Sequence, residues 1–421
     1  MRQTTPLRAR PRSITFVLLA VTVCLIAITA PAFASSSASP MPVETSPAAA
    51  ASPVAEPAPA VLTCVLSRAA LAFGDTVTVT GTLTPAAEGQ EVLVTSGTAE
   101  AGRVLTDASG AFALTFTPRR SGDVVASLSA DPTVVSAPQA LAVKPKITVS
   151  HGALVPFLAS QFVVRVAPSA YDGSVVIEVV HRGLTVGSYR ARVKDGRAVS
   201  QIPLRGVDTF TLNVTAPAAS GLAGRSVRTR VAVPAKTLSA GSSGPYVKGM
   251  LTGLQRLKFR VPGAGSTFTS QVNDSVMAFQ KAYRLPRTYV FNTACWRKLD
   301  GAKTIRPRRS SPSTHIEVDK GRQILMIVTN GKVFGIIAVS TGATGNTPEG
   351  SFRIQQKHPF TTSGYGGILV RTMGFVGDFA IHGYSPVPPY PASHGCIREP
   401  IWACYWVYDQ SSVGEALFVY R

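Results

Sequence analysis

The chain has 421 residues, of which 45% are hydrophobic and 15% are charged, and its 42 lysines and arginines against 22 acidic residues give a formal net charge of +20 at pH 7. This length excludes a single hydrophobic core and predicts several domains. The charge is compatible with binding to nucleic acid or with attraction to an anionic cell envelope, and it does not by itself identify a ligand.

Residues 1–34 have the pattern of a secretory signal. Four arginines precede an apolar run over residues 14–30, and Ala32-Phe33-Ala34 matches a small-x-small cleavage site with Ser35 as the first mature residue. The apolar run is also close to the length that spans a bilayer, so an uncleaved membrane anchor is the alternative. We therefore expect an exported protein of the cell wall or the extracytoplasmic space, which favours the anionic envelope over nucleic acid.

Residues 35–60 are dominated by Ala, Pro and Ser, with Glu44 and Glu56 as their only charges. Such a segment cannot bury a core, and it predicts an extended, semi-stiff tether.

Residues 61–145 and 146–236 form a weak internal repeat of alternating, β-branched segments separated by Gly, Asp and Pro. This pattern predicts two antiparallel β-sandwiches of immunoglobulin-like type. Neither contains a set of residues that points to catalysis, so we expect both to act as spacers. The predicted strands include 76–80, 90–94, 111–116, 161–166, 174–179 and 209–214.

Residues 238–300 change to a helical pattern, with apolar residues near helical spacing and a turn at Pro262-Gly263. The segment predicts three short helices and resembles the small three-helix peptidoglycan-binding module. Within it, Gln255, Gln280 and Tyr283 are the candidates for ligand contact. Residues 301–313 follow as a basic linker. The residues that carry the resemblance are Gly244, Val247, Leu254, Gln255, Leu257, Phe279, Gln280 and Trp296.

Residues 314–421 predict strand after strand, with Asn330-Gly331 and Gly366-Gly367 as turns and one short helix over residues 402–408. This indicates an all-β domain of ordinary size. The predicted strands are 316–318, 324–328, 333–339, 352–354, 368–370, 379–381 and 416–420.

Near the end of the chain a cysteine follows two histidines and precedes an arginine. The chain reads Ile381-His382-Gly383, then a Pro-rich stretch, then Ser393-His394-Gly395-Cys396-Ile397-Arg398. A thiol becomes a useful nucleophile beside a base, and His382 can reach Cys396 if the Pro-rich stretch folds back as a loop. Gly395 lets the backbone approach a substrate, so the amides of Gly395 and Cys396 can both point at a developing oxyanion. These residue types fit acyl transfer through a thioester.

Ala380 to Arg398 resembles the active-site signature of the L,D-transpeptidases (the YkuD-like family), which ends in Ser-His-Gly-Cys-Ile/Val-Arg/Asn. The resemblance covers the last quarter of the chain and implies one β-rich catalytic domain at residues 314–421. The matching upstream segments are His315–Asp319, Gly331–Val333, Val339–Gly342 and Thr347–Phe352.

The resemblance also implies roles for individual residues. Cys396 is expected as the nucleophile and His382 as the general base. The imidazole is oriented by a backbone carbonyl, that of Gly383, or by Ser393, and the sequence leaves both open. Expected further contributions are oxyanion donors from Gly395 and Cys396, support of the loop or oxyanion site from His394, and substrate contacts from Arg398, Tyr384 and Phe375.

The family implies peptidoglycan as the substrate. A donor tetrapeptide stem loses its terminal D-Ala, and the side-chain amine of an acceptor stem resolves the thioester into a 3→3 cross-link. No cofactor or metal is expected, and β-lactams of the carbapenem type are expected inhibitors.

Three alternatives compete with this interpretation. Water in place of the amine would make the protein an L,D-carboxypeptidase, and an inactive domain would leave a wall-binding protein. A zinc site is the third alternative, since His382, His394, Cys396 and Cys404 are all possible metal ligands, and it is disfavoured because the His-Gly-Cys step is tighter than structural zinc spacing. A disulfide between Cys295 and Cys404 is a further hypothesis, because a secreted location permits one.

Overall fold

The structure is a computed structural model that describes residues 58–263 and 265–421. The predicted signal at residues 1–34 and most of the predicted tether lie outside the described residues. The described part contains 25 strands and four helices, so the prediction of a mainly β chain is confirmed. None of its helices combines the length and the apolar character that crossing a bilayer requires.

The first β domain packs two sheets around an aliphatic core that includes Val79, Val92 and Val124, all fully buried. Strand residues alternate between core and solvent, as in Val77 and Val79 of β4, because successive side chains of a strand point to opposite faces. One sheet has the order β1 (Val61–Leu62), β4 (Val77–Thr84), β2 (Val65–Leu66), with β7 (Ala111–Phe116) paired to β4. The other has the order β3 (Ala70–Ala72), β9 (Gln139–Lys144), β8 (Gly122–Leu128), β5 (Glu91–Ser96), β6 (Ala99–Leu105).

The second β domain is again two packed sheets, and all of its strand pairs are antiparallel. Its core is larger and includes Phe162, Ile177 and Phe210. The prediction of two consecutive β-sandwich domains is therefore confirmed, and their immunoglobulin-like type stays a prediction. The two sheets are β10 (Lys146–His151), β11 (Ala159–Ala167), β14 (Arg197–Pro203), and β13 (Leu184–Arg192), β12 (Ser174–His181), β15 (Thr209–Ala216), β16 (Arg225–Ala232).

The helical segment contains the three predicted helices, α1 (Pro245–Arg256), α2 (Ser270–Ala282) and α3 (Thr293–Gly301). Side chains cap two of them: Thr269 accepts a hydrogen bond from the backbone of α2, and Asn292 accepts one from the backbone of α3. Trp296 is fully buried and donates its indole N–H to the Lys236 carbonyl at 2.7 Å. Gln280 is also fully buried, so the prediction that it contacts a ligand is wrong.

The C-terminal domain packs two sheets and one helix, α4 (Ile401–Asp409), and its core includes Ile316, Phe375 and Ile381. Two strands escaped prediction: β21 is largely exposed, so it lacks the alternation of a half-buried strand, and β24 has three residues. One sheet is β19 (Lys332–Ala338), β18 (Ile324–Thr329), β17 (His315–Asp319), β25 (Ala416–Tyr420), β20 (Gly350–Arg353). The other is β21 (Gln356–Thr362), β22 (Ile368–Val376), β23 (Phe379–Gly383), β24 (Ile397–Glu399).

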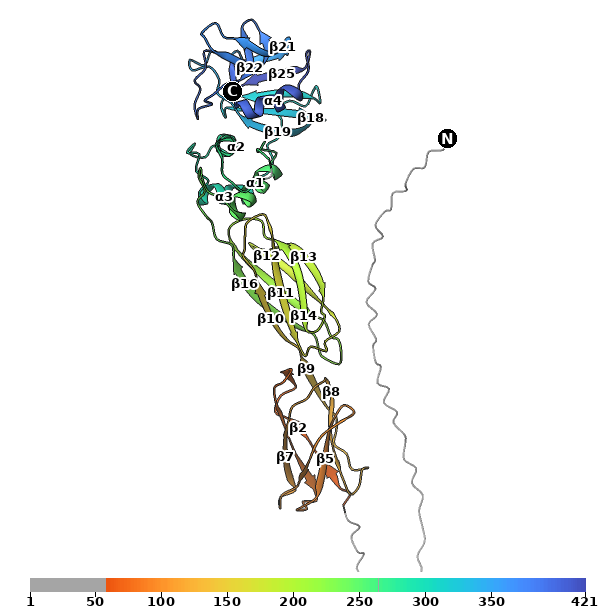
Figure 1. Ribbon diagram of the computed structural model, residues 1–421. Coiled ribbons are helices and arrows are strands. Elements are labelled where there is room, and N and C mark those ends of the chain that lie inside the picture. The colour runs from red at the N-terminus through yellow and green to blue at the C-terminus, as the bar shows by residue number, and fades with distance from the viewer. Residues whose placement is uncertain (1–57, 264) are drawn as a thin grey trace, which may run out of the picture. The chain divides into compact units, whose positions relative to one another are not determined.

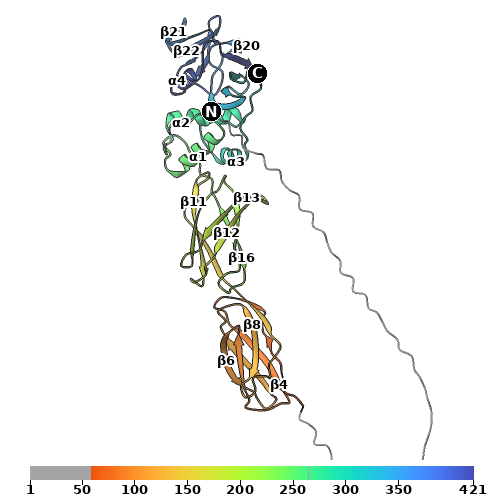
Figure 2. The same cartoon turned by 90° about the vertical axis from the view of Figure 1, so that its right-hand side faces the viewer.

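The helices and the C-terminal domain share one hydrophobic core. Phe259 and Phe279 belong to the same buried cluster as Met326 of β18 and Ile336 of β19. The backbone joins as well, since Arg260 donates to the Ile336 carbonyl at 2.9 Å. Figures 1 and 2 show the three helices directly beside this domain. The helical segment is therefore part of one packed unit with the C-terminal domain.

This shared core makes a prediction about stability. Phe279→Ala should destabilise the unit by about 3–5 kcal/mol, because truncating a buried Phe leaves a cavity. Hydrogen exchange should then accelerate in β18 and β19 as well as in α2. Phe162→Ala, at an equally buried site in the second sandwich, is the matched control and should leave β18 unaffected. Unchanged exchange in β18 on Phe279→Ala would show that the two cores are separate.

Candidate active site

The predicted catalytic motif lies across the parallel pair of β23 and β24. The register aligns Ile381 with Ile397 and His382 with Arg398. Both isoleucines are fully buried in the core. Because neighbouring residues of a strand point to opposite faces, His382, Cys396 and Arg398 share the face away from that core. The fold therefore brings together His382 of β23, Arg398 of β24 and Cys396, which directly precedes β24 and donates its thiol to the Asp378 carbonyl at 3.6 Å.

The imidazole of His382 is held by its own strand. Its Nδ1 lies 3.3 Å from the Gly383 carbonyl, and with the proton on Nδ1 the other nitrogen, Nε2, is free to accept one. Ser393 instead donates its hydroxyl to the Cys396 carbonyl at 2.5 Å. Of the two candidates for orienting the base, the Gly383 carbonyl makes the contact and Ser393 supports the loop.

Burial keeps both reacting groups neutral. It lowers the pKa of His382 to about 4, against the hydrogen bond with the Gly383 carbonyl and with a further lowering by the charge of Arg398. Burial also raises the pKa of the Cys396 thiol, while a hydrogen bond from the Ala380 backbone and the Arg398 charge oppose that rise. The resting pair is thus a thiol and a neutral imidazole, which suits proton transfer during attack rather than a preformed thiolate.

One prediction about the oxyanion donors is wrong. The N–H of Gly395 donates to Ser393 Oγ at 3.1 Å and is not free for a substrate. The N–H of Cys396 makes no hydrogen bond within residues 58–263 and 265–421, so it is the available donor. Gly395 is required for another reason: its φ is 139°, and a Cβ there would lie 2.4 Å from the Phe379 ring.

A second segment, residues 340–347, forms hydrogen bonds with the backbone of the motif. Thr347 donates its hydroxyl to the Gly395 carbonyl at 2.6 Å, and Asn346 donates to the His394 carbonyl at 2.8 Å. Ser340 and Arg398 exchange two backbone hydrogen bonds, each 2.9 Å long. The segments that resemble the family include residues 340–342 and Thr347, but nothing in their residue types indicated these contacts.

Aromatic rings surround the exposed side of the motif. The His394 ring stacks on Tyr365 with 4.1 Å between centroids, and Tyr365 itself was not predicted as a site residue. Arg398 lies over the Tyr384 ring at 4.9 Å, and His382 meets the same ring edge-on at 6.0 Å. The Tyr384 ring therefore contacts both Arg398 and His382.

Two further predictions are wrong: the substrate contact of Phe375 and the disulfide between Cys295 and Cys404. Phe375 is 1% exposed and packs on Phe352 in the core, so it cannot line a substrate cleft. Cys295 and Cys404 are both free and buried, so the hypothesis of a disulfide between them is wrong. In the described part of the chain, no group of three or more His, Cys, Asp or Glu side chains is arranged to hold a metal ion.

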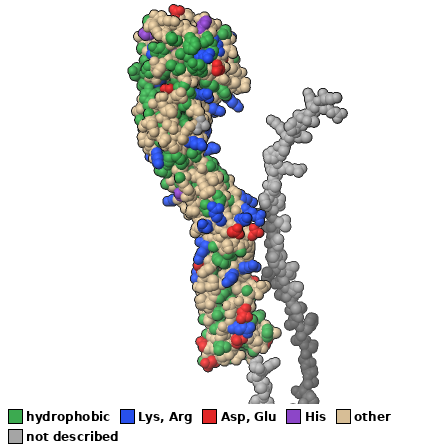
Figure 3. All heavy atoms as spheres, viewed as in Figure 1, with side chains coloured by type: hydrophobic (Ala, Val, Ile, Leu, Met, Phe, Trp, Pro, Cys, Tyr) green, Lys and Arg blue, Asp and Glu red, His purple; other side chains and the backbone are tan. Residues whose placement is uncertain are grey.

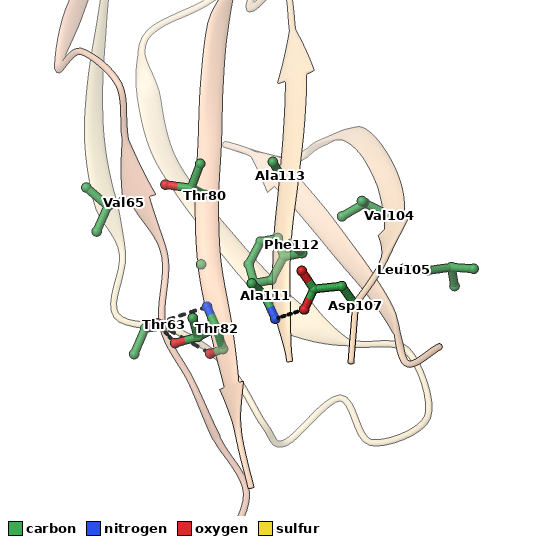
Figure 4. A pocket seen from close by; sticks show the side chains of 11 residues that line it. Thr63, Val65, Thr80, Thr82, Val104, Leu105, Asp107, Ala111, Phe112 and Ala113 are labelled. Atoms are coloured by element: carbon green, nitrogen blue, oxygen red, sulfur yellow. Dashed lines mark hydrogen bonds between the residues drawn. The ribbon is translucent and has the colours of Figure 1, made fainter. Parts of the chain in front are cut away.

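A hollow in the first sandwich offers no comparable chemistry (Figure 4). Threonine, aliphatic and aromatic side chains line most of it, with Phe112 among them. Its carboxylate, Asp107, accepts hydrogen bonds from the backbone of Ser109 and Ala111, so its role is to hold a turn.

The helix α2 supports the loop that leads into the motif. Lys281 is fully buried and donates to the carbonyls of Val339 at 2.7 Å and Pro388 at 3.0 Å. Burial lowers the pKa of Lys281 to about 7, the Arg287 charge adds to this, and Asp274 opposes it. Two carbonyl contacts to a buried amine thus fix the Pro-rich loop to strand β19.

Removing this amine should loosen the loop. Lys281→Met leaves two buried carbonyls without their donor, at a cost of about 1–3 kcal/mol, and should accelerate amide exchange at residues 390–396. Lys298→Met, at an exposed position of α3, is the control and should change neither quantity. Hydrogen-exchange mass spectrometry measures both. Equal exchange in the two variants would show that the amine does not hold the loop.

Comparison with known proteins agrees with this geometry. Residues 313–419 match the model of the YkuD family, described as the L,D-transpeptidase catalytic domain. A comparison with curated proteins gives no match.

Solved structures provide further similarity. An L,D-transpeptidase from Xylanimonas cellulosilytica is 31% identical over 44% of this chain and 98% of its own, with a TM-score of 0.42. One from Stackebrandtia nassauensis is 22% identical over 44% of this chain and 95% of its own, with a TM-score of 0.30. The L,D-transpeptidase LdtMt1, solved in complex with imipenem, is 13% identical over 66% of this chain and 99% of its own, with a TM-score of 0.24. By this family match, residues 313–419 form an L,D-transpeptidase catalytic domain of the YkuD family.

Proposed function

We propose that the protein is a peptidoglycan L,D-transpeptidase that forms 3→3 cross-links through a thioester on Cys396. The observation that carries this proposal is the β23–β24 pairing within a domain of this family, which places His382 of β23 next to the start of β24, directly after Cys396. The chemistry of a neutral thiol beside a neutral, oriented imidazole is acyl transfer.

In the first half-reaction a donor tetrapeptide stem acylates the enzyme. Nε2 of His382 takes the thiol proton as Cys396 Sγ attacks the carbonyl carbon of the third residue. The C–N bond to the terminal D-Ala then breaks, and the imidazolium returns the proton to the leaving amine. The N–H of Cys396 faces the oxyanion, whose stabilisation by one such donor typically contributes about 3 kcal/mol.

In the second half-reaction the side-chain amine of an acceptor stem attacks the thioester carbonyl. His382 accepts the amine proton, the new amide bond forms, and the C–S bond breaks with the proton returned to the thiolate. These steps need no oxidant, reductant or cofactor. Water in place of the amine would release a tripeptide instead, which is the L,D-carboxypeptidase reaction.

The remaining parts of the proposal concern partners and location. Because LdtMt1 was solved with imipenem, we expect β-lactams of the carbapenem type to acylate Cys396 here. The pattern of residues 1–34 supports export to the cell wall, with anchoring through residues 14–30 if the signal is retained. The helical segment would contact peptidoglycan through exposed residues such as Gln255, since Gln280 is buried.

The reaction can be tested with a disaccharide-tetrapeptide substrate and mass spectrometry. The protein should produce a cross-linked dimer with release of D-Ala, and Cys396→Ala should lower the rate by at least about 10³-fold. Cys64→Ala, which removes a buried thiol in the first sandwich, is the control and should retain activity.

The other outcomes separate the alternatives. Tripeptide without dimer would identify the carboxypeptidase. No turnover with retained binding to cell-wall sacculi would leave a binding protein.

The neutral pair predicts an unusual pH profile. His382 must be unprotonated to accept the thiol proton, and its pKa is lowered to about 4, so acylation by imipenem should not decline until the pH approaches 4. Intact-protein mass spectrometry at several pH values gives the rate. A decline centred near pH 6.5, the ordinary value for histidine, would contradict a buried neutral base.

The same shift has a consequence for stability. The unfolded chain takes up a proton at His382 near pH 6.5, whereas the folded chain does so only near pH 4. The free energy of unfolding should therefore fall as the pH falls between these values. Thermal unfolding of His382→Gln should lack this part of the pH dependence.

A further inference from the structure

The two sandwich domains carry net charges of opposite sign. Residues 146–236, the second sandwich, carry 12 basic against 4 acidic residues, whereas residues 61–145, the first sandwich, carry 5 against 7. Figure 3 shows Lys and Arg side chains along the second sandwich. Two neighbouring domains of the same architecture thus differ in the sign of their charge, which a general need for solubility does not explain.

Four of these arginines share one surface. In β15, Phe210 and Leu212 point into the core, so Thr211 and Asn213 face outward. Their register partners on β16 are Arg230 and Arg228. The same outward face therefore includes both of these guanidinium groups.

The opposite edge of this face is built in the same way. On β12, Val175 and Ile177 point into the core, and the outward residues Ser174 and Val176 pair with Arg192 and Arg190 of β13. Three strand spacings, about 14 Å, separate the two edge strands. The sheet order β13-β12-β15-β16 thus places two arginines along each edge, and we call this surface the arginine face.

Short polar side chains occupy the β15 part of the arginine face, whereas Val176 and Val180 face outward on β12. Thr211, Asn213 and Thr215 come from β15, and Thr215 shares a hydrogen bond of 2.8 Å with Ser226 of β16. Glu178 is the carboxylate among the outward residues of β12. Hydroxyl and amide groups between long guanidinium side chains offer donors to an anionic chain that lies across the sheet.

The guanidinium groups are mostly uncompensated. Within the described ranges Arg190, Arg228 and Arg230 form no ion pair, and Arg192 pairs with Asp172 where both side chains are more than 70% exposed, which contributes little. In the first sandwich, by contrast, Arg103 is paired with both Glu91 and Glu100. Arg103 of the first sandwich is thus compensated by two carboxylates, whereas the arginines of the arginine face are mostly not.

We propose that the arginine face binds a linear, phosphate-bearing polymer that runs from Arg190 and Arg192 on one edge to Arg228 and Arg230 on the other. All four side chains are Arg rather than Lys, and the forked guanidinium matches two phosphate oxygens at once. The face favours a non-nucleic polymer, since the aromatic residue of its strands nearest the arginines, Tyr189, packs toward the core and leaves no ring there for a base to stack on.

Binding of the full chain to long-chain inorganic polyphosphate, measured by titration calorimetry at fixed salt, tests this proposal. Arg228→Gln/Arg230→Gln should weaken binding about tenfold or more, and Arg190→Gln/Arg192→Gln should do the same. The matched control is Arg284→Gln/Arg297→Gln, which removes the same charge from exposed positions in the helical segment and should change affinity by less than about threefold.

Several outcomes would overturn the proposal. Equal losses in the face variants and in the control would show attraction by net charge alone. Equal affinity for polyglutamate would remove the preference for phosphate, and tighter binding of single-stranded or duplex DNA would replace the polymer by nucleic acid. Every variant should keep the circular dichroism spectrum and the thermal unfolding midpoint of the unaltered protein, which confirms folding and keeps this test independent of the catalytic proposal.

Discussion

The parallel pairing of β23 with β24 is the constraint on which the site depends. The register of this short pair puts Ile381 and Ile397 into the core. His382, Cys396 and Arg398 therefore face the other side. A slip of one residue would reverse every side chain and bury the nucleophile. Residues 340–347 donate hydrogen bonds to the carbonyls of His394 and Gly395. These contacts stabilise the register, because they fix the loop that enters β24.

The helical segment takes part in this arrangement. It supplies most of a continuous core, and from that core Lys281 reaches the backbone of the Pro-rich loop. The segment resembles a separate binding module, yet its packing makes it a support of the catalytic domain. If it also contacts peptidoglycan, that contact occurs at a fixed distance from Cys396, which would orient the enzyme on its substrate.

The fold class and the three helices could be predicted from the sequence because these depend on local patterns. Alternation revealed most strands, helical spacing revealed the helices, and the motif around Cys396 is specific. Prediction from the sequence failed where long-range contacts decide the role of a residue. Gln280 and Phe375 are residue types that occur both in sites and in cores, and only packing separates the two cases. The use of the Gly395 amide by Ser393, and the stacking of Tyr365 on His394, depend on loop geometry that no residue pattern expresses.

The most direct test of the account is the identity of the acylated residue. After incubation with the donor tetrapeptide alone and rapid acid quenching, peptide mapping by mass spectrometry should find the muropeptide acyl group on Cys396, at a mass lower by one D-Ala than the donor. His382→Ala should abolish this adduct while Cys396 remains present as a free thiol. An adduct on another residue, or its formation at the normal rate in His382→Ala, would contradict the thiol–imidazole pair on which the account rests.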